Sequence, residues 1–133
     1  MTGYYSKAFD STQLILYCVL IYWLSDQSAL PAPELFRHQD KVVHAGAYFV
    51  MAAFALRAFR HFTSSRSILI LSTLIFCSLY GLSDEWHQSF VLGRMSDVAD
   101  WVADTVGAML FLGVYCLYRS KYASFKQIPP HNQ

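Results

Sequence analysis

The sequence is poor in charged residues and has no excess of either sign. Only 14% of its 133 residues are charged, and the formal net charge is +1, whereas soluble domains average about 25% charged residues. A chain with so balanced a charge offers no broad basic surface, so we expect no nucleic-acid partner. The apolar fraction is 55% and the aromatic fraction 17%. This composition indicates a small integral membrane protein.

Cysteine is also scarce, and its positions exclude two common roles. The three cysteines are Cys18, Cys77 and Cys116, an odd number without any C-x-x-C pair. Each stands inside an apolar run rather than in a loop. Neither a disulfide framework nor a zinc site built on cysteine is therefore predicted, and we expect the three to act as small buried apolar residues.

Four windows of the sequence, given at the end of this paragraph by residue number, contain no Pro, Asp, Glu, Lys or Arg. Each window is shorter than the roughly 20 residues that a membrane-spanning helix needs, so a soluble helical bundle is the alternative. Two features favour membrane spans: the windows are apolar on nearly all sides rather than along one stripe, and each can be lengthened at one end. The windows are residues 11–25, 42–56, 67–83 and 105–118.

We therefore predict an all-α fold, a polytopic membrane protein whose single domain, residues 1–133, is a bundle of four transmembrane helices. The apolar run that follows Lys7 has features of a secretion signal, but the residues after it form a poor cleavage site, so we expect a retained first helix. Residues 128–133 are expected to form a disordered tail. The expected helices are roughly 8–25, 40–59, 67–87 and 97–118.

The distribution of Lys and Arg predicts the orientation of the bundle. With four spans, the two termini and the middle loop share one side of the membrane, and that side holds most of the basic residues. The positive-inside rule then places both termini in the cytoplasm of a bacterial inner membrane, with loops 26–39 and 88–96 facing outward. The inner basic residues are Lys7, Arg57, Arg60, Arg66, Arg119, Lys121 and Lys126, and the outer ones are Arg37, Lys41 and Arg94.

Polar residues of three predicted helices gather at this outer end. Asp40, His44 and Tyr48 recur every four residues and therefore share one face of the second helix. The end of the third helix and the start of the fourth add Asp84, Glu85, His87 and Gln88, then Asp97, Asp100 and Asp104. Carboxylates are costly inside a bilayer unless they are paired or hydrated. The permanent cations nearby are Lys41 and Arg94, so we expect protons, a divalent cation or both to balance the acidic excess.

These residues, with Gly93, Gly107 and Ala108, form four short motifs. Each motif alone would be weak evidence, but the four together at these spacings form a specific pattern. The motifs are Asp40-Lys41-x-x-His44-x-x-x-Tyr48, Asp84-Glu85-x-His87-Gln88, Gly93-Arg94 and Asp100-x-x-x-Asp104-x-x-Gly107-Ala108. The pattern covers the second to fourth helices and resembles the VanZ-like family of small bacterial membrane proteins. Asp104 stands where that family usually has Asn, which donates as well as accepts hydrogen bonds. The resemblance implies a role at the cell envelope and, from the member that gives the family its name, an effect on teicoplanin-type glycopeptide sensitivity.

Two interpretations of the polar residues stand side by side. The first is a network of interhelical contacts that fixes the register of the bundle. The second is a site for the phosphate or pyrophosphate headgroup of an envelope or cell-wall lipid, with Arg94 and Lys41 contacting the anion. The candidate residues are Asp40, Lys41, His44, Asp84, Glu85, His87, Gln88, Arg94, Asp100 and Asp104.

A divalent cation would extend the second interpretation. Mg²⁺ prefers oxygen ligands, and an ion held by Glu85, Asp100 and Asp104 would bridge these carboxylates to a phosphate. Metal-assisted hydrolysis or transfer at the headgroup is then an alternative function, although no nucleophile–base pair is visible and the question of catalysis stays open. A structural or interaction subunit of an envelope complex, or a small transporter, is another. The expected partners are membrane lipids and, for a subunit, a second membrane protein.

Overall fold

The computed structural model describes residues 2–28 and 36–125, and four helices make up most of this part of the chain. They are α1 (Thr2–Ser25), α2 (Gln39–Phe59), α3 (Arg66–Gln88) and α4 (Val98–Phe125). The described residues contain no strand, which confirms the predicted all-α fold with four helices. The tail predicted to be disordered, residues 128–133, lies outside the described residues.

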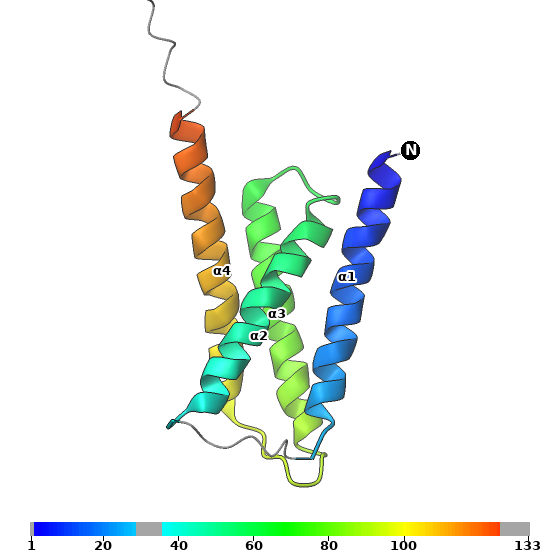
Figure 1. Ribbon diagram of the computed structural model, residues 1–133, viewed down its shortest axis with the longest axis vertical. Helices are drawn as coiled ribbons and strands as arrows, with labels where there is room; N and C mark the ends of the chain where they lie inside the picture. Colours follow the sequence, from blue (N-terminus) through cyan, green and yellow to red (C-terminus); the bar gives the residue numbers. More distant parts are fainter. Residues whose placement is uncertain (1, 29–35, 126–133) are drawn as a thin grey trace, which may run out of the picture.

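The helices run antiparallel to their neighbours in sequence (Figure 1). The start of α1 and the end of α4 lie at the same end of the bundle, as expected for an even number of spans. At the other end, α1 and α3 finish and α2 and α4 begin; we call this the polar end. The candidate residues of the sequence analysis lie at this end, within about two helical turns of the helix termini.

Each helix is long and apolar enough to cross a membrane. The outward faces carry large apolar side chains that would be costly in water, such as Ile15, Leu71 and Leu117, each more than half exposed. Such faces are typical of contact with lipid, and the protein is accordingly a multi-pass membrane protein. The segments that meet this requirement of length and composition are Ser6–Ser25, Gln39–Phe59, Arg66–Gln88 and Val98–Lys121.

Helix α2 lies at the centre of the bundle and packs against the other three helices, most extensively against α4. Among the described residues, α1 and α4 make no packing contact with each other, and Figure 1 shows them on opposite sides of α2 and α3. The buried face of α2 is rich in alanine, including the fully buried Ala52 and Ala55. Small side chains allow neighbouring backbones to approach closely, which explains the central position of this helix.

The crossing of α2 and α4 is closest at Gly107. A Cβ atom at that position would lie 2.0 Å from the carbonyl oxygen of Ala45, so any larger residue would force the helices apart. Gly81 has a similar role on α3, where a Cβ would lie 2.8 Å from Oδ2 of Asp104. These two glycines allow α3 and α4 to bring their polar residues up to those of α2.

Candidate functional site

Lys41 lies among three carboxylates where α2 and α4 begin. Its Nζ atom is 2.5 Å from Oδ2 of Asp97, 2.8 Å from Oδ1 of Asp100 and 3.0 Å from Oδ2 of Asp40. The hydrogen bond from the Lys41 ammonium, followed by one from the backbone N–H of Ala99, holds the pKa of Asp97 below its usual value. A single lysine therefore pairs with acidic residues at the start of both helices and joins their ends.

Asp97 also forms the start of α4. Its Oδ1 accepts a hydrogen bond from the N–H of Ala99 at 2.8 Å, the contact that a capping carboxylate makes at a helix N-terminus. Its own N–H donates to Oε2 of Glu85 at 2.7 Å. Glu85 thus ties the last turn of α3 to the start of α4. The other carboxylate oxygen of Glu85, Oε1, is buried and has no hydrogen-bond partner among the described residues.

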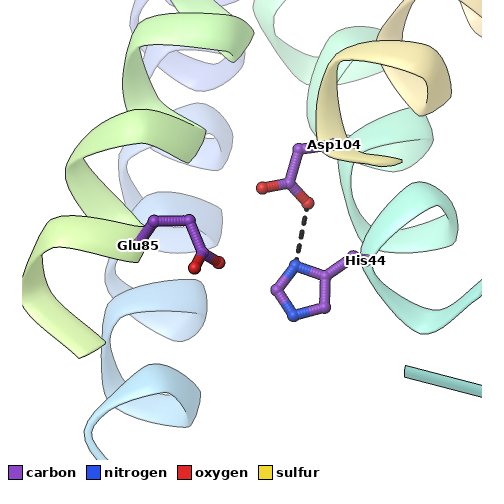
Figure 2. Close-up of side chains that lie close together, drawn as sticks. All are labelled: His44, Glu85 and Asp104. Atoms are coloured by element: carbon purple, nitrogen blue, oxygen red, sulfur yellow. Dashed lines mark hydrogen bonds and ion pairs between the residues drawn. The ribbon is translucent and has the colours of Figure 1, made fainter. Parts of the chain in front are cut away.

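His44, Glu85 and Asp104 converge from three different helices (Figure 2). Nδ1 of His44 on α2 is 3.0 Å from Oδ1 of Asp104 on α4. One ligand atom from each of the three residues lies within 4.8 Å of the others. Glu85 is 4% exposed and Asp104 0%. Like Oε1 of Glu85, Oδ2 of Asp104 is buried without a hydrogen-bond partner in residues 2–28 and 36–125.

Asp84 forms a separate group with Ser25 and Gln88. Ser25 donates from Oγ to Oδ1 of Asp84 at 2.5 Å. Gln88, one turn further along α3, donates from Nε2 to Oδ2 of Asp84 at 3.1 Å and to Oγ of Ser25 at 3.3 Å. All three side chains are buried. This group joins the last turn of α1 to the last turn of α3.

Arg94 lies in the loop between α3 and α4, immediately after Gly93, whose φ of +83° favours glycine. Its Nε donates to the carbonyl of Gln27 at 2.9 Å, and Nη2 donates to the carbonyl of Leu24 at 3.0 Å. These carbonyls lie at and just beyond the C-terminal end of α1, where the helix dipole is negative. Because a guanidinium has five N–H donors, Arg94 can hold α1 and still present N–H groups to a ligand.

A cavity of about 300 Å³ opens at the polar end between α1, α2 and α3. One part of its wall is apolar and is formed by Ile21, Leu24, Val43 and Ala47. The other part is polar. It is formed by Ser25, Gln39, Asp40, His44, Tyr48, Asp84, Gln88 and Arg94. The arrangement suits an amphipathic molecule, with a polar group among the polar side chains and a chain against the apolar wall.

The structure distributes the predicted candidates over three neighbouring groups around Lys41, His44 and Asp84, with Arg94 beside them. His87 joins none of the groups. Its ring stacks on Tyr22 with centroids 4.5 Å apart, and its Nε2 lies 3.3 Å from Oδ1 of the exposed Asp26. Of the three residues predicted to hold a cation, Glu85 and Asp104 lie close together beside His44, whereas Asp100 contacts Lys41. Cation binding itself stays a prediction.

Sequence reasoning missed a charged cluster at the opposite end of the bundle. Asp10 of α1 is 1% exposed and accepts hydrogen bonds from Nη2 of Arg57 at 2.7 Å and Nη2 of Arg60 at 3.0 Å. Nε2 of His61 lies 2.8 Å from Oδ2 of the same carboxylate. The sequence contains only a weak indication of this cluster. Asp10 is the one acidic residue in the first 25 positions, and Arg60 and His61 follow Arg57 by three and four residues.

Comparison with known proteins places this arrangement in a family. The sequence model of the family described as VanZ/LLP1 matches residues 5–119. A protein of the fission yeast Schizosaccharomyces pombe (strain 972 / ATCC 24843), "Uncharacterized protein C11E3.10", is 30% identical over 125 residues, covering 91% of this chain and 73% of that protein. No solved structure matches.

Proposed function

The chain belongs to the VanZ/LLP1 family, and we propose that it binds the phosphorylated headgroup of an envelope lipid in the cavity at its polar end. The observation that carries the proposal is the two-sided lining of this cavity. Its apolar wall continues the lipid-facing surface of α2, since Val43 is 61% exposed. A lipid lying against that surface would therefore bring its headgroup to the polar wall without leaving the membrane.

The charges of the polar wall favour a headgroup that carries both an anion and a hydrogen-bond donor. Arg94 supplies the permanent cation of the lining, and a guanidinium fits phosphate oxygens well. His44 is a second group that can donate to the phosphate. Asp40 and Asp84 line the same cavity and would accept from an amine or hydroxyl of the headgroup. Lys41, expected as an anion contact, is held by three carboxylates, so we assign it no direct contact.

The location of the cavity links the proposal to the envelope. We propose that both termini lie in the cytoplasm of a bacterial inner membrane, because most Lys and Arg residues flank the opposite end. The cavity would then face the outer leaflet, where lipid-linked cell-wall precursors carry phosphate groups. Binding such a precursor would alter sensitivity to glycopeptides of the teicoplanin type.

Native mass spectrometry of the detergent-purified protein tests headgroup binding. We expect the wild type to retain a phosphorylated lipid. Val43→Trp, which fills the cavity from an exposed position, should lose it, and Arg94→Lys should retain less because lysine lacks the guanidinium fork. Arg119→Ala removes an exposed arginine at the other end of the bundle and should retain as much lipid as the wild type.

The outcomes separate the candidate functions. Equal retention by the wild type and Val43→Trp would show that the lipid binds elsewhere and would contradict the proposal. A wild type that retains no phosphorylated lipid would favour a purely structural network or a protein partner. Conversion of the lipid on prolonged incubation would instead identify an enzyme.

A further inference from the structure

We infer that His44, Glu85 and Asp104 form a binding site for a divalent transition-metal ion such as Zn²⁺ or Mn²⁺. The three residues come from α2, α3 and α4, and their side chains point toward one another (Figure 2). One ligand atom from each lies within 4.8 Å of the others. The inference rests on these contacts and does not depend on the proposed lipid.

Two buried carboxylate oxygens point to a ligand in this group. Oε1 of Glu85 and Oδ2 of Asp104 have no hydrogen-bond partner among the described residues, and both side chains are more than nine-tenths buried. A buried polar atom without a partner is costly, and an ionised carboxylate more so. The second oxygen of each carboxylate is already occupied, by the N–H of Asp97 and by His44. A cation placed between the two free oxygens would satisfy both.

In residues 2–28 and 36–125, no lysine or arginine side chain supplies such a cation. Lys41 contacts Asp40, Asp97 and Asp100, and the hydrogen bonds of Arg94 go to carbonyls at the end of α1 and not to Glu85 or Asp104. His44 can carry at most one positive charge, against two carboxylates. A divalent ion would offset both carboxylates and leave the imidazole neutral, the form in which histidine binds metals.

The donor atoms favour a transition metal over magnesium. One imidazole nitrogen with two carboxylates is a ligand set that Zn²⁺, Mn²⁺ and Fe²⁺ accept, whereas Mg²⁺ is held by oxygen. Two ligands about 2.1 Å from one ion lie about 3.0–3.4 Å apart. Nδ1 of His44 and Oδ1 of Asp104 are 3.0 Å apart and share a hydrogen bond, so an ion bound to Nδ1 would replace the proton of that bond. Glu85 would have to move closer to complete the set. Because His44 also lines the cavity, an ion held there would border it.

Zinc binding by the purified protein tests the inference. The protein is freed of metal with a chelator, its affinity tag is removed, and Zn²⁺ alone is titrated in a calorimeter, with Mg²⁺ in a parallel titration. We expect one Zn²⁺ per chain and much weaker Mg²⁺ binding. Glu85→Gln should weaken zinc binding by at least about tenfold, since lost contacts at metal sites typically cost that much or more. Asp104→Asn should do the same.

Three controls keep the result specific. Asp84→Asn changes a buried carboxylate outside the group and should bind zinc like the wild type. So should His38→Gln with His131→Gln, which leaves His44 in place. Asp100→Asn should also keep zinc, because Lys41 holds that carboxylate.

Either of two results would overturn the inference: a wild type that binds no zinc, or a Glu85→Gln protein that binds it as tightly as the wild type. Glu85→Gln decides the case if Asp104→Asn does not fold, because a glutamine can still accept the hydrogen bond from Asp97. A wild type that binds zinc but retains no phosphorylated lipid would overturn the proposed function alone.

Discussion

Gly107 of α4 passes so close to Ala45 of α2 that a Cβ on the glycine would lie 2.0 Å from the alanine carbonyl oxygen. The residue before Ala45 is His44, and Asp104 lies one turn before Gly107 on α4. The close crossing therefore places Nδ1 of His44 3.0 Å from Oδ1 of Asp104. The absence of a side chain at Gly107 therefore determines how closely α2 and α4 approach at the polar end.

Gly107→Ala is expected to destabilise the protein. The added methyl group must push α2 and α4 apart, and overpacking of this kind typically costs about 1–3 kcal/mol. The free energy of unfolding in mixed micelles of mild detergent and dodecyl sulfate measures the change. Gly113→Ala is the matched control on the same helix, because its Cβ would meet no atom within 4 Å. Equal stability of the two variants would contradict this account of the crossing.

Lys41→Met is expected to loosen the start of α2 and α4. It leaves Asp40, Asp97 and Asp100 without their shared cation, and the loss of hydrogen bonds to charged groups costs about 1–3 kcal/mol. Adding Asp100→Asn should recover part of the loss, because the double variant no longer holds an unpaired carboxylate at the buried position. A double-mutant cycle of unfolding free energies measures this coupling. Strictly additive effects would show that the Lys41–Asp100 contact carries no energy.

Asp10→Asn is expected to destabilise the opposite end of the bundle. The amide replaces a carboxylate that is 1% exposed and that pairs with Arg57 and Arg60. The expected loss is about 1–3 kcal/mol, as for other hydrogen bonds to charged groups, and thermal unfolding followed by circular dichroism would detect it. Asp26→Asn, which changes an exposed carboxylate of the polar end, should unfold like the wild type. A larger loss of thermal stability in Asp26→Asn than in Asp10→Asn would contradict this prediction.

The sequence was sufficient to predict the four helices and the end at which their polar residues meet. Uncharged windows without proline limit where helices can lie, and four antiparallel spans necessarily bring residue 40, residues 84–88 and residues 97–104 to one end. The contacts within that end depend on how far each helix is rotated about its axis. Spacing alone could therefore not predict that His44 lies beside Glu85 and Asp104, or that Asp100 contacts Lys41. The cation set predicted from the sequence, Glu85, Asp100 and Asp104, stays a prediction.

Contacts between residues far apart in the sequence were beyond the reach of pattern analysis for the same reason. Asp10 meets Arg57 only because α1 packs on α2 in this register. Ser25 lies at the end of an apolar run and carries no motif, yet it donates to Asp84. Arg94 was expected to face a ligand, and its hydrogen bonds to the end of α1 appear only when the loop is folded.

Reporter fusions in bacteria test the orientation that the positive-inside rule predicts. A green fluorescent protein fused after residue 133 should fluoresce, because both termini are predicted to lie in the cytoplasm. Alkaline phosphatase inserted after Leu92, in the loop between α3 and α4, should be active, because that loop is predicted to face outward. The opposite pattern would place the polar end in the cytoplasm and would exclude a ligand from the outer leaflet.

Photo-crosslinking from the cavity wall tests the central proposal most directly. A photoreactive phenylalanine analogue at Val43 faces the cavity. The same analogue at Val102, an exposed position in the first half of α4, faces lipid away from the cavity. After irradiation in native membranes, the bound lipids are released and identified by mass spectrometry. A phosphorylated envelope lipid enriched at position 43 over position 102 is the predicted result. The same bulk lipid mixture at both positions would contradict headgroup binding in the cavity.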